Sequence, residues 1–292
     1  MSNDSIVYIN GKYVHKNEAL VSVFDRGILY GDGFFEGIRI YNGKIFMCDE
    51  HIDRFFDSSK YTNIILNYSK DEIVDIIEKL IEMNNVKDGY IRLVATRGAY
   101  NLGLTPPTPD VANPTLICIV SNITLYDRKF YDNGMNAIFS SFTRIGTSML
   151  DPQCKSLNYM LNILAKMEAN NRGAQEAIFL NSNGIVTECT GDNIFIIKDD
   201  VVYTPPSYTG ILNGITRILI IKILKKLGYD IREQEFTRYN VYTADECFLT
   251  GTAAEVISVV NIDGRLINDG KVGPHTKIIM NEYKKYIDSV CN

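Results

Sequence analysis

Turn dipeptides recur along the chain and separate short runs of apolar and β-branched residues. Asn10-Gly11, Asn42-Gly43, Asn183-Gly184 and Asp263-Gly264 each stand between two such runs. An asparagine or aspartate followed by glycine suits the positive φ angles of a two-residue hairpin turn, so the flanking runs are expected to pair as antiparallel strands. Many hairpins without regular strand–helix alternation indicate a mixed α and β fold of the α+β type.

Apolar periodicity predicts the individual elements. The expected strands span residues 6–10, 12–14, 20–24, 34–41, 44–48, 90–96, 115–120, 135–142, 177–180, 185–188, 193–197, 201–203, 247–249 and 256–261. The expected helices span residues 50 to about 62, 70–84, 215–227 and about 275–287, and a further helical pattern has its first apolar residue at Leu157 and ends near Arg172. Residues 26–33 are expected to form a glycine-rich turn, and the proline-rich residues 98–114 a loop that acts as a lid or a partner contact.

The polar stretch from Ser121 to Gly134 indicates a domain boundary. A chain of 292 residues is long enough for two domains with cores of their own. We therefore expect a small N-terminal α/β domain over residues 1–122, a linker over 123–134, and a large C-terminal α/β domain over 135–292.

Composition excludes several classes of protein. The net charge of −5 gives no basic footprint for nucleic acid, and no apolar run approaches the roughly 18 residues of a membrane span. The first five residues lack the basic and apolar parts of a signal peptide, so the cytoplasm is the expected location. Six scattered cysteines without a C-x-x-C pair, and only three histidines, predict neither a metal site nor a disulfide framework.

One lysine stands where a buried helix is expected to begin. Apolar residues recur every three or four positions from Leu157 to Met167, with Pro152 before the pattern and Gly173 after it. Lys155 would lie at the mouth of this helix. A lysine in a partly apolar site can lose its proton and act as an amine nucleophile, which is the chemistry of a Schiff base. The plainer interpretation is an ordinary surface lysine.

Three segments further along offer partners for such a lysine. Glu188 ends a strand pattern in a turn of small residues and could pair with the protonated ring nitrogen of a pyridinium cofactor; alternatively it is a surface acid. The Asn213-Gly214-Ile215-Thr216 segment opens a helix, where free amides and the helix dipole favour phosphate, unless Asn213 simply caps that helix. In residues 249–255, the small residues of Thr250-Gly251-Thr252-Ala253-Ala254 break a strand pattern and could form an anion-binding nest or a tight β-bend. Together these features describe a pyridoxal phosphate pocket with space for a substrate carboxylate.

The order of the motifs KSLNY, TECTGDNIF, GITR and GTAAE resembles that of the fold-type IV pyridoxal-phosphate transaminases, and LYGDGFFEGIRIYNG and HIDRFFDSS match the same family. The similarity runs from about residue 6 to about residue 280. Within the family, FEGIR and YIR are most similar to the branched-chain amino-acid aminotransferases. The resemblance implies a two-domain, D-amino-acid-aminotransferase-like fold with its active site between the domains.

The resemblance also implies roles toward the cofactor, pyridoxal 5′-phosphate. Lys155 would hold it as a Schiff base and then carry the proton between the substrate Cα and the cofactor C4′. Glu188 would pair with the pyridine nitrogen, and Tyr159 would contact the phenolic oxygen. The implied phosphate ligands are Arg54, Gly214, Ile215, Thr216 and Thr252. Without the resemblance, the preferred interpretation of Arg54 is a surface ion pair with Asp53 or Asp57.

For the substrate, the resemblance implies that the amides of Thr252 and Ala253 and the Tyr90 hydroxyl bind the α-carboxylate. Arg92 would meet the second carboxylate of glutamate. One pocket must accept leucine and glutamate in alternate half-reactions, and a mostly apolar pocket with one arginine at its rim can do so. The implied pocket walls are Tyr30, Phe35 and Tyr159, although strand aromatics are usually core residues.

The predicted reaction is a ping-pong transamination of L-leucine, L-isoleucine and L-valine with 2-oxoglutarate, which gives branched-chain 2-oxo acids and L-glutamate. In the family, the loop around Leu102 and Leu104 crosses to the neighbouring subunit's pocket. The expected small-molecule partners are therefore amino acids and 2-oxo acids. Further copies of the chain are expected to form a dimer at least, with a trimer of dimers as the larger alternative.

Three alternatives to the branched-chain aminotransferase stay open: two other enzymes with the same fold, and a protein without catalytic activity. Asp32-Gly33 also occurs in D-amino-acid transaminases, and some branched-chain enzymes carry one more residue between the lysine and its tyrosine. The arginine-x-histidine carboxylate trap of the D-specific enzymes is missing after Tyr90, where Leu102 and Leu104 stand instead. An aminodeoxychorismate lyase would use the same scaffold for elimination. A non-catalytic binding protein would have lost the lysine or the ring partner, and both positions are intact.

Overall fold

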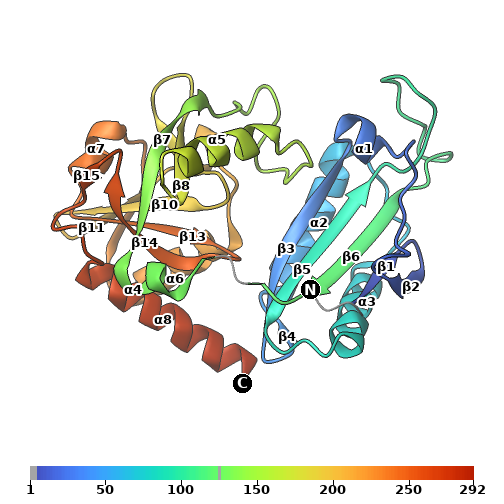
Figure 1. Cartoon of the computed structure of the whole chain (residues 1–292), viewed down its shortest axis with the longest axis horizontal. Coiled ribbons are helices and arrows are strands. Elements are labelled where there is room, and N and C mark those ends of the chain that lie inside the picture. Colours follow the sequence, from blue (N-terminus) through green and yellow to red (C-terminus); the bar gives the residue numbers. More distant parts are fainter. Residues whose placement is uncertain (1–4, 124–125) are drawn as a thin grey trace. The chain divides into compact units, whose positions relative to one another are not determined.

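The computed structural model describes residues 5–123 and 126–292 (Figure 1). The first four residues, which entered the prediction about a signal peptide, and residues 124–125 of the expected linker lie outside this part. The chain forms two compact units. The first unit contains the residues up to 123 together with 154–158 and 290–292, and the second contains the remaining residues up to 289.

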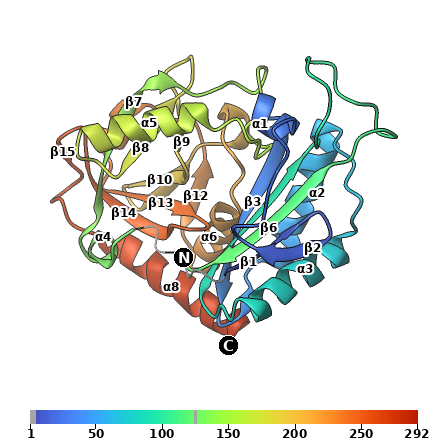
Figure 2. The same cartoon turned by 45° about the vertical axis from the view of Figure 1, so that its right-hand side comes forward.

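The first unit is an antiparallel sheet with two helices on one face. The strands are β1 (Ile6–Ile9), β2 (Lys12–His15), β3 (Gly33–Tyr41), β4 (Lys44–Ile45), β5 (Gly89–Thr96) and β6 (Thr115–Ser121). They follow the order β2-β1-β6-β5-β3-β4. The helices are α1 (Arg26–Tyr30), α2 (Cys48–Thr62) and α3 (Lys70–Met83). Helices α2 and α3 lie on one face of the sheet (Figure 2). Their apolar residues pack with Phe34, Ile38 and Ile40 of β3 into one core, which leaves the opposite face of β3 for other contacts.

The second unit is built around a ring of strands. Its strands are β7 (Met135–Thr143), β8 (Glu176–Leu180), β9 (Val186–Cys189), β10 (Asn193–Lys198), β11 (Val201–Thr204), β12 (Asp230–Glu233), β13 (Glu246–Gly251), β14 (Glu255–Ile262) and β15 (Arg265–Leu266). The order is β12-β11-β10-β13-β14-β7-β8-β9, and β15 pairs with β14. Because β9 also pairs with β10, six of these strands close on themselves. The helical elements are α4 (Arg128–Asn133), α5 (Met160–Asn171), η1 (Ser207–Thr209), α6 (Ile215–Lys226), α7 (Arg238–Tyr242) and α8 (Pro274–Cys291).

The four predicted hairpin turns are confirmed. Both residues of each turn have positive φ at 10–11, 42–43 and 263–264. The turn at 183–184 joins β8 to β9, and there Gly184 has a φ of 76°. The mixed α and β fold class is also confirmed. Among the described residues, no helix combines the length and apolar character needed to cross a membrane.

Several element predictions are wrong, and each has a physical reason. Residues 20–24 form no strand, and Leu20, Val23 and Phe24 are exposed. The expected glycine-rich turn at 26–33 contains helix α1, which Asp25 caps by accepting a hydrogen bond from the Gly27 amide. The short elements α4, α7, β12 and β15 were missed because an element of two to six residues carries too little periodicity to be recognised.

The helix after the lysine also differs from the prediction. Helix α5 begins at Met160, and its buried residues are Asn162, Ala165 and Ala169. Leu164 and Met167, expected on its buried face, are exposed. Small residues allow this helix to pack closely on its neighbours β7 and β8. The lysine therefore does not lie at the mouth of a buried apolar helix.

Candidate functional site

The lysine segment extends the first sheet. The Lys155 carbonyl accepts a hydrogen bond of 2.9 Å from the Phe35 amide, and the Leu157 amide donates one of 2.9 Å to the Gly33 carbonyl. The segment thus pairs with the N-terminal half of β3, where β4 is absent because β4 pairs only with Ile40 and Tyr41. These bonds explain why the segment groups with the first unit and not with the domain over 135–292 to which the sequence assigned it.

Four of the predicted site residues gather on one face of this sheet. The Lys155 Nζ atom lies 4.7 Å from the centre of the Phe35 ring. The Arg92 guanidinium carbon lies 4.4 Å from the centre of the same ring and 5.5 Å from that of Tyr90. The Phe35 ring therefore carries an ammonium and a guanidinium group together, which cation–π attraction favours. Phe35 also faces away from the core that contains its neighbour Phe34, so plain core packing does not explain it.

A glycine makes room for Tyr90. Gly37 pairs with Arg92 across β3 and β5, and a Cβ atom added at Gly37 would stand 1.7 Å from the Tyr90 hydroxyl oxygen. The tyrosine therefore lies across the glycine, and any side chain at position 37 would displace it. In the sequence, Gly37 stood within a family motif and had no predicted role of its own.

Arg54 is held by a buried carboxylate. Its Nε and Nη2 atoms donate hydrogen bonds of 2.7 and 2.9 Å to the two Glu36 oxygens, and His51 Nδ1 lies 2.9 Å from Glu36 Oε2. Glu36 is therefore the main partner of Arg54, and not Asp53 or Asp57, as the sequence without the family resemblance suggested. Burial opposes the charge of Glu36, but the Arg54 guanidinium and the His51 hydrogen bond hold the pKa of Glu36 well below its ordinary value. Burial also lowers the pKa of His51.

The sequence signal for this cluster was the spacing within α2. His51 and Arg54 are three residues apart and so lie on the same side of the helix. Glu36, however, comes from β3, and only the packing of α2 on that strand brings it between them. Neither Glu36 nor His51 was predicted from the sequence.

Tyr30 lies on α1 and contacts the proline-rich loop. Its hydroxyl oxygen accepts a 2.9 Å hydrogen bond from the Gly103 amide. Arg26 donates to the Gly103 and Leu104 carbonyls at 2.9 and 3.1 Å and to Asp32 at 2.8 Å. The loop is thus fastened at the position where Leu102 and Leu104 are exposed. This hydrogen bond supports a role of Tyr30 in holding the loop more directly than the predicted role as a wall of the substrate pocket.

Asp32 joins a second arginine to this arrangement. Arg97 donates to Asp32 through Nε and Nη2 at 2.8 and 2.9 Å, and to the carbonyls of Thr62 and Asn63 at 2.9 Å. Burial opposes the charge of Asp32, but Arg97 and Arg26 lower the pKa of its carboxyl group. The Arg97 guanidinium therefore directs its Nε, Nη1 and Nη2 hydrogen bonds to groups of the first unit.

In the second unit, Glu188 is buried and not a surface acid. Its side chain is 7% exposed. Arg144 Nη2 donates to Oε1, the Leu212 amide donates to Oε2 at 2.8 Å, and Asn193 Nδ2 donates to Oε2 at 3.2 Å. A carboxylate held by a guanidinium and two amides keeps a fixed orientation, as a partner for a cationic ring nitrogen requires. Neither partner was predicted: Asn193 stood in the same family motif without a role of its own, and Arg144 lies 44 positions from Glu188.

The predicted phosphate turn opens α6. Gly214 is the residue that precedes the first helical position, and it has no side chain to cap the helix. Asn213 does not cap it either, and instead accepts a 3.0 Å hydrogen bond from Arg217 Nη1. Ile215 and Thr216 are buried in the first turn. A helix of twelve residues with this N-terminus presents amide groups and a positive dipole end to an anion.

The second small-residue segment is the turn between β13 and β14. Thr252 and Ala253 are half-buried there, and Tyr131 donates a 3.2 Å hydrogen bond to the Ala254 carbonyl. A Cβ atom at Gly251 would stand 1.9 Å from an Asp192 carboxylate oxygen, so the turn approaches that side chain closely. Next to it, the Thr250 hydroxyl is buried and has no hydrogen-bond partner among the described residues.

Tyr159 is the residue immediately before α5 and is half-buried. It groups with the second unit, whereas Lys155 groups with the first, so the two parts of the KSLNY motif divide between the units after Asn158. The predicted site residues therefore form two sets. The first unit carries Lys155, Arg54, Tyr30, Phe35, Tyr90 and Arg92, and the second carries Tyr159, Glu188, Gly214, Ile215, Thr216, Thr252 and Ala253.

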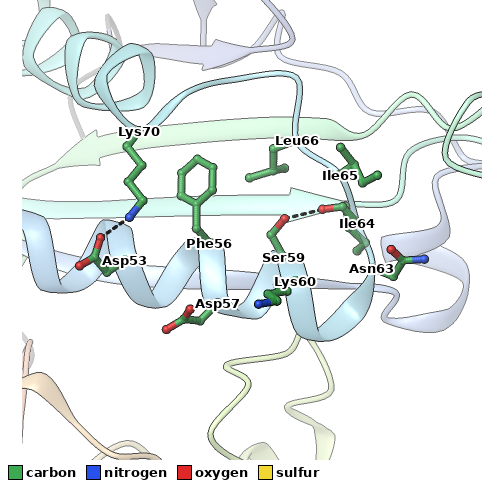
Figure 3. Close-up of a pocket in the computed structure, with 10 residues that line it drawn as sticks. All are labelled: Asp53, Phe56, Asp57, Ser59, Lys60, Asn63, Ile64, Ile65, Leu66 and Lys70. Atoms are coloured by element: carbon green, nitrogen blue, oxygen red, sulfur yellow. Dashed lines mark hydrogen bonds and ion pairs between the residues drawn. The ribbon is translucent and has the colours of Figure 1, made fainter.

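A surface hollow on the first unit is separate from these residues. It lies along α2 and the segment that follows. Figure 3 shows Lys70 paired with Asp53, and the Ser59 hydroxyl donating to the Ile64 carbonyl. None of the predicted site residues lines it. The hollow therefore gives no support to the predicted site.

Comparison with known proteins identifies the class. The family model of the class IV amino-transferases matches residues 33–262, which include β3, the lysine segment and the β13–β14 turn. The chain belongs to this family and is an aminotransferase.

Its relatives within the family carry two different names. A Methanocaldococcus jannaschii protein provisionally named branched-chain-amino-acid aminotransferase is 47% identical over 278 residues, with 95% of each chain covered. The D-alanine aminotransferase of Staphylococcus aureus strain N315 is 40% identical over 285 residues, with 97% of this chain and 98% of the relative covered.

Solved structures agree with the fold. The branched-chain amino acid aminotransferase of Escherichia coli superposes with a TM-score of 0.93 at 34% identity and covers 97% of this chain and 94% of its own. The corresponding T.th. enzyme, solved with pyridoxamine 5′-phosphate, gives a TM-score of 0.92 at 34% identity, with 98% and 95% covered. These similarities confirm the predicted fold-type IV architecture.

Proposed function

We propose that this aminotransferase uses pyridoxal 5′-phosphate to transfer the amino group of L-leucine, L-isoleucine and L-valine to 2-oxoglutarate. The observation that carries the proposal is the group of Lys155, Phe35, Tyr90 and Arg92 on one face of the first sheet. A reactive amine, an aromatic wall and one guanidinium group are what a pocket needs to take both an apolar side chain and a second carboxylate.

The residues present fit the cofactor. The buried Thr250 hydroxyl, which bonds to none of the described residues, offers a polar group beside the β13–β14 turn, and Gly214 leaves the α6 N-terminus without a side chain. The donor set also matches in charge: an amine for the aldehyde, a carboxylate for the ring nitrogen, and a helix terminus with Arg54 for the phosphate. When bound, the cofactor supplies a pyridinium ring that accepts the electron pair released at the substrate Cα.

Each protein group then has a defined task. Lys155 binds the cofactor aldehyde and, once the substrate has replaced it, moves the proton at the substrate Cα. Glu188, kept in place by Arg144, holds the proton on the ring nitrogen. The Tyr90 hydroxyl and the amides of Thr252 and Ala253 bind the substrate α-carboxylate, and Arg92 binds the distal carboxylate of glutamate.

Two observations favour the L-branched-chain substrates over D-alanine, the substrate named for the Staphylococcus relatives. Leu102 and Leu104 occupy the part of the loop where D-specific enzymes carry their carboxylate trap. Arg97 is the arginine nearest to Leu102 in the sequence, and it already donates hydrogen bonds to Asp32 and to two carbonyl groups. The trap that holds a D-amino acid therefore has no counterpart in residues 97–104 of this chain.

An amino-donor screen with 2-oxoglutarate tests the proposal. We expect glutamate formation with L-leucine, L-isoleucine and L-valine at rates at least about tenfold above that with D-alanine. Lys155→Ala is the control and should show no turnover and no lysine-bound cofactor absorbance while the chain stays folded. Preference for D-alanine would reject the substrate assignment, and undiminished activity in Lys155→Ala would reject the mechanism.

We also propose that the chain works as a homodimer at least. Large apolar residues are exposed on α1, on the segment before it and on the loop fastened to it. They are Leu20, Val23, Phe24, Ile28, Leu102, Leu104 and Val111. Apolar exposure of this extent on one part of a soluble protein indicates a protein–protein interface, and a second copy is the partner that the family resemblance implies.

A further inference from the structure

Two groups connect the expected ring partner to the segment before the expected phosphate turn: the Leu212 N–H, which donates directly to Glu188 Oε2 at 2.8 Å, and the buried side-chain amide of Asn193. Asn193 Nδ2 donates a 3.2 Å hydrogen bond to Glu188 Oε2 and a 2.8 Å hydrogen bond to the Leu212 carbonyl. Leu212 stands two residues before Gly214, which precedes α6. Asn193 is only 5% exposed, so both bonds form away from water.

The same side chain is in contact with the helix start itself. A Cβ atom added at Gly214 would stand 2.2 Å from Asn193 Oδ1. Position 214 therefore has to be glycine for the α6 N-terminus to approach Asn193 this closely. The nitrogen of the amide holds the chain before the turn, and its oxygen packs against the turn.

The strand pairing places Asn193 at a junction. It faces Glu188 in the pair that joins β9 to β10, and it faces Thr250 in the pair that joins β10 to β13. Directly paired residues on antiparallel strands project from the same face, so Glu188, Asn193 and Thr250 form one row. The row therefore crosses β9, which carries Glu188, then β10, and then β13, which leads into the turn with Thr252.

From these contacts we infer that Asn193 is a positioning residue that fixes the spacing between the Glu188 carboxylate and the amide groups at the start of α6. The inference rests on the proposed use of pyridoxal 5′-phosphate. The ring nitrogen and the phosphate of that cofactor are joined by covalent bonds, so their separation varies little. A protein that holds the two receiving groups at the matching separation loses less conformational entropy on binding, and the two contacts reinforce each other.

Two ligands separate this role from simple structural support. Pyridoxal 5′-phosphate uses both the ring site and the phosphate site, whereas pyridoxal has the same ring and aldehyde without the phosphate. The ratio of their dissociation constants therefore measures what the phosphate site adds once the ring is bound. A residue that only stabilises the fold would change the unfolding temperature and leave this ratio unchanged in the folded protein.

The experiment uses the full chain, freed of cofactor, with Asn193→Asp as the main variant. Aspartate keeps the outline of the side chain and the oxygen against Gly214 but loses both N–H donors to Glu188 and Leu212. We expect the ratio of the pyridoxal constant to the pyridoxal 5′-phosphate constant to fall at least about tenfold relative to the unsubstituted chain. Asn193→Ser, which removes the bridge without adding a charge, gives the same measurement if the aspartate variant does not fold.

Asn181→Asp is the matched control. Asn181 is an amide of the same unit that donates to the Thr209 carbonyl and accepts from the Asn183 and Ile185 amides, so it supports a turn without contact with Glu188. Its ratio should equal that of the unsubstituted chain. A ratio within about twofold of that value in the folded Asn193 variant or variants would overturn the inference. Absence of lysine-dependent cofactor binding in the unsubstituted chain would instead reject the proposed function.

Discussion

Gly37 provides the most direct test of the substrate site at the scale of one residue. A methyl group at this position would stand 1.7 Å from the Tyr90 hydroxyl oxygen and 2.6 Å from the ring carbon that bears it. Both atoms belong to the far end of a side chain that can rotate away. Gly37→Ala should therefore displace the Tyr90 hydroxyl at little cost in stability. We expect the KM for the amino acid to rise at least about tenfold, with the unfolding temperature nearly unchanged.

A double substitution identifies the cause of that effect. If Gly37→Ala acts through Tyr90, it should add little to a Tyr90→Ala chain, so the two effects on KM should be far from additive. Gly146→Ala is the control, because the nearest atom to its added Cβ is 4.0 Å away. Additive effects of the two substitutions, or an unchanged KM in Gly37→Ala, would show that the glycine does not position Tyr90.

Glu36 makes acid stability a second test at this scale. Burial opposes its charge, but Arg54 and His51 lower its pKa below the ordinary value of 4.5. Below about pH 4.5 the unfolded chain takes up a proton at this position before the folded chain does, so folding stability falls with pH. The contribution of Glu36 is thus complete above about pH 4.5 and is lost as the pH falls through the lowered folded value.

Glu36→Gln should remove this contribution. Breaking a buried, hydrogen-bonded ion pair by removing one partner costs about 3–5 kcal/mol, and we expect a loss of this order near neutral pH. The difference in free energy of unfolding between the two chains should stay constant above about pH 5 and shrink as the pH falls from about 4.5 to about 3. Denaturant titration at each pH measures it, with the exposed Glu82→Gln as the control. A difference that stays constant over this range would contradict the assignment.

The residues that we propose to react could be named from the sequence, whereas the residues that hold them in place could not. Lys155 and Glu188 stand in motifs whose residue types suit their chemistry, and the motifs were recognisable. Arg144 lies 44 positions from Glu188, and Glu36 lies 18 positions from Arg54. Such pairs form only through strand pairing and helix packing. A single sequence contains no local signal for them.

At the scale of elements, the lysine segment shows how a strand-like extension can be mistaken for a helix start. Leu157 entered the predicted helical pattern because its spacing to the later apolar residues suits a helix. In the structure, its amide bonds to the Gly33 carbonyl, and α5 begins three residues later, at Met160. Main-chain pairing with β3 decides the conformation here, and such pairing leaves no periodicity in five residues.

Gly33→Ala tests the docking of that segment. The added Cβ would stand 2.4 Å from the Ala95 carbonyl oxygen and 2.8 Å from a Leu157 methyl carbon. One of these atoms is backbone, so β3, β5 or the lysine segment has to shift. We expect a loss of stability of about 1–3 kcal/mol, together with slower reaction of Lys155 with pyridoxal 5′-phosphate.

Comparison with Gly37→Ala separates the two glycines. Both lie in β3, but only the substitution at Gly33 should lower the unfolding temperature. Hydrogen exchange supplies a second measurement, because the Phe35 and Leu157 amides should lose protection in Gly33→Ala and keep it in Gly37→Ala. Equal stability of the two variants would argue against the backbone contact, and retained protection at Leu157 would argue against a displaced segment.

At the scale of the whole molecule, the proline-rich loop connects the fold to the proposed assembly. Arg26 and Tyr30 fasten it through the Gly103 and Leu104 main chain, while the Leu102 and Leu104 side chains are exposed. A loop held this firmly with leucines facing outward is suited to enter a neighbouring subunit. On the proposed dimer, each pocket then depends on the loop of the other copy.

Mixing two inactive variants tests this dependence. Lys155→Ala lacks the reactive amine but keeps its loop, whereas Leu102→Asp keeps the amine and places a charge at the loop tip. In a mixed dimer, the intact lysine would receive the intact loop, so one of the two sites should work. Random mixing in equal amounts should restore roughly a quarter of the unsubstituted activity, because about half of the dimers are mixed and each has one complete site.

Controls show whether recovered activity in the mixing experiment comes from exchange of the loop between subunits. Each variant alone should be inactive or nearly so, and light scattering should show that both remain dimers. Leu266→Asp replaces Leu102→Asp as the matched substitution, because Leu266 is also exposed but lies on β15 of the second unit. That chain should be active alone. If Leu102→Asp is inactive yet mixing restores nothing, the loop serves its own subunit, because the two defects would then fall in separate sites that no exchange of loops can repair.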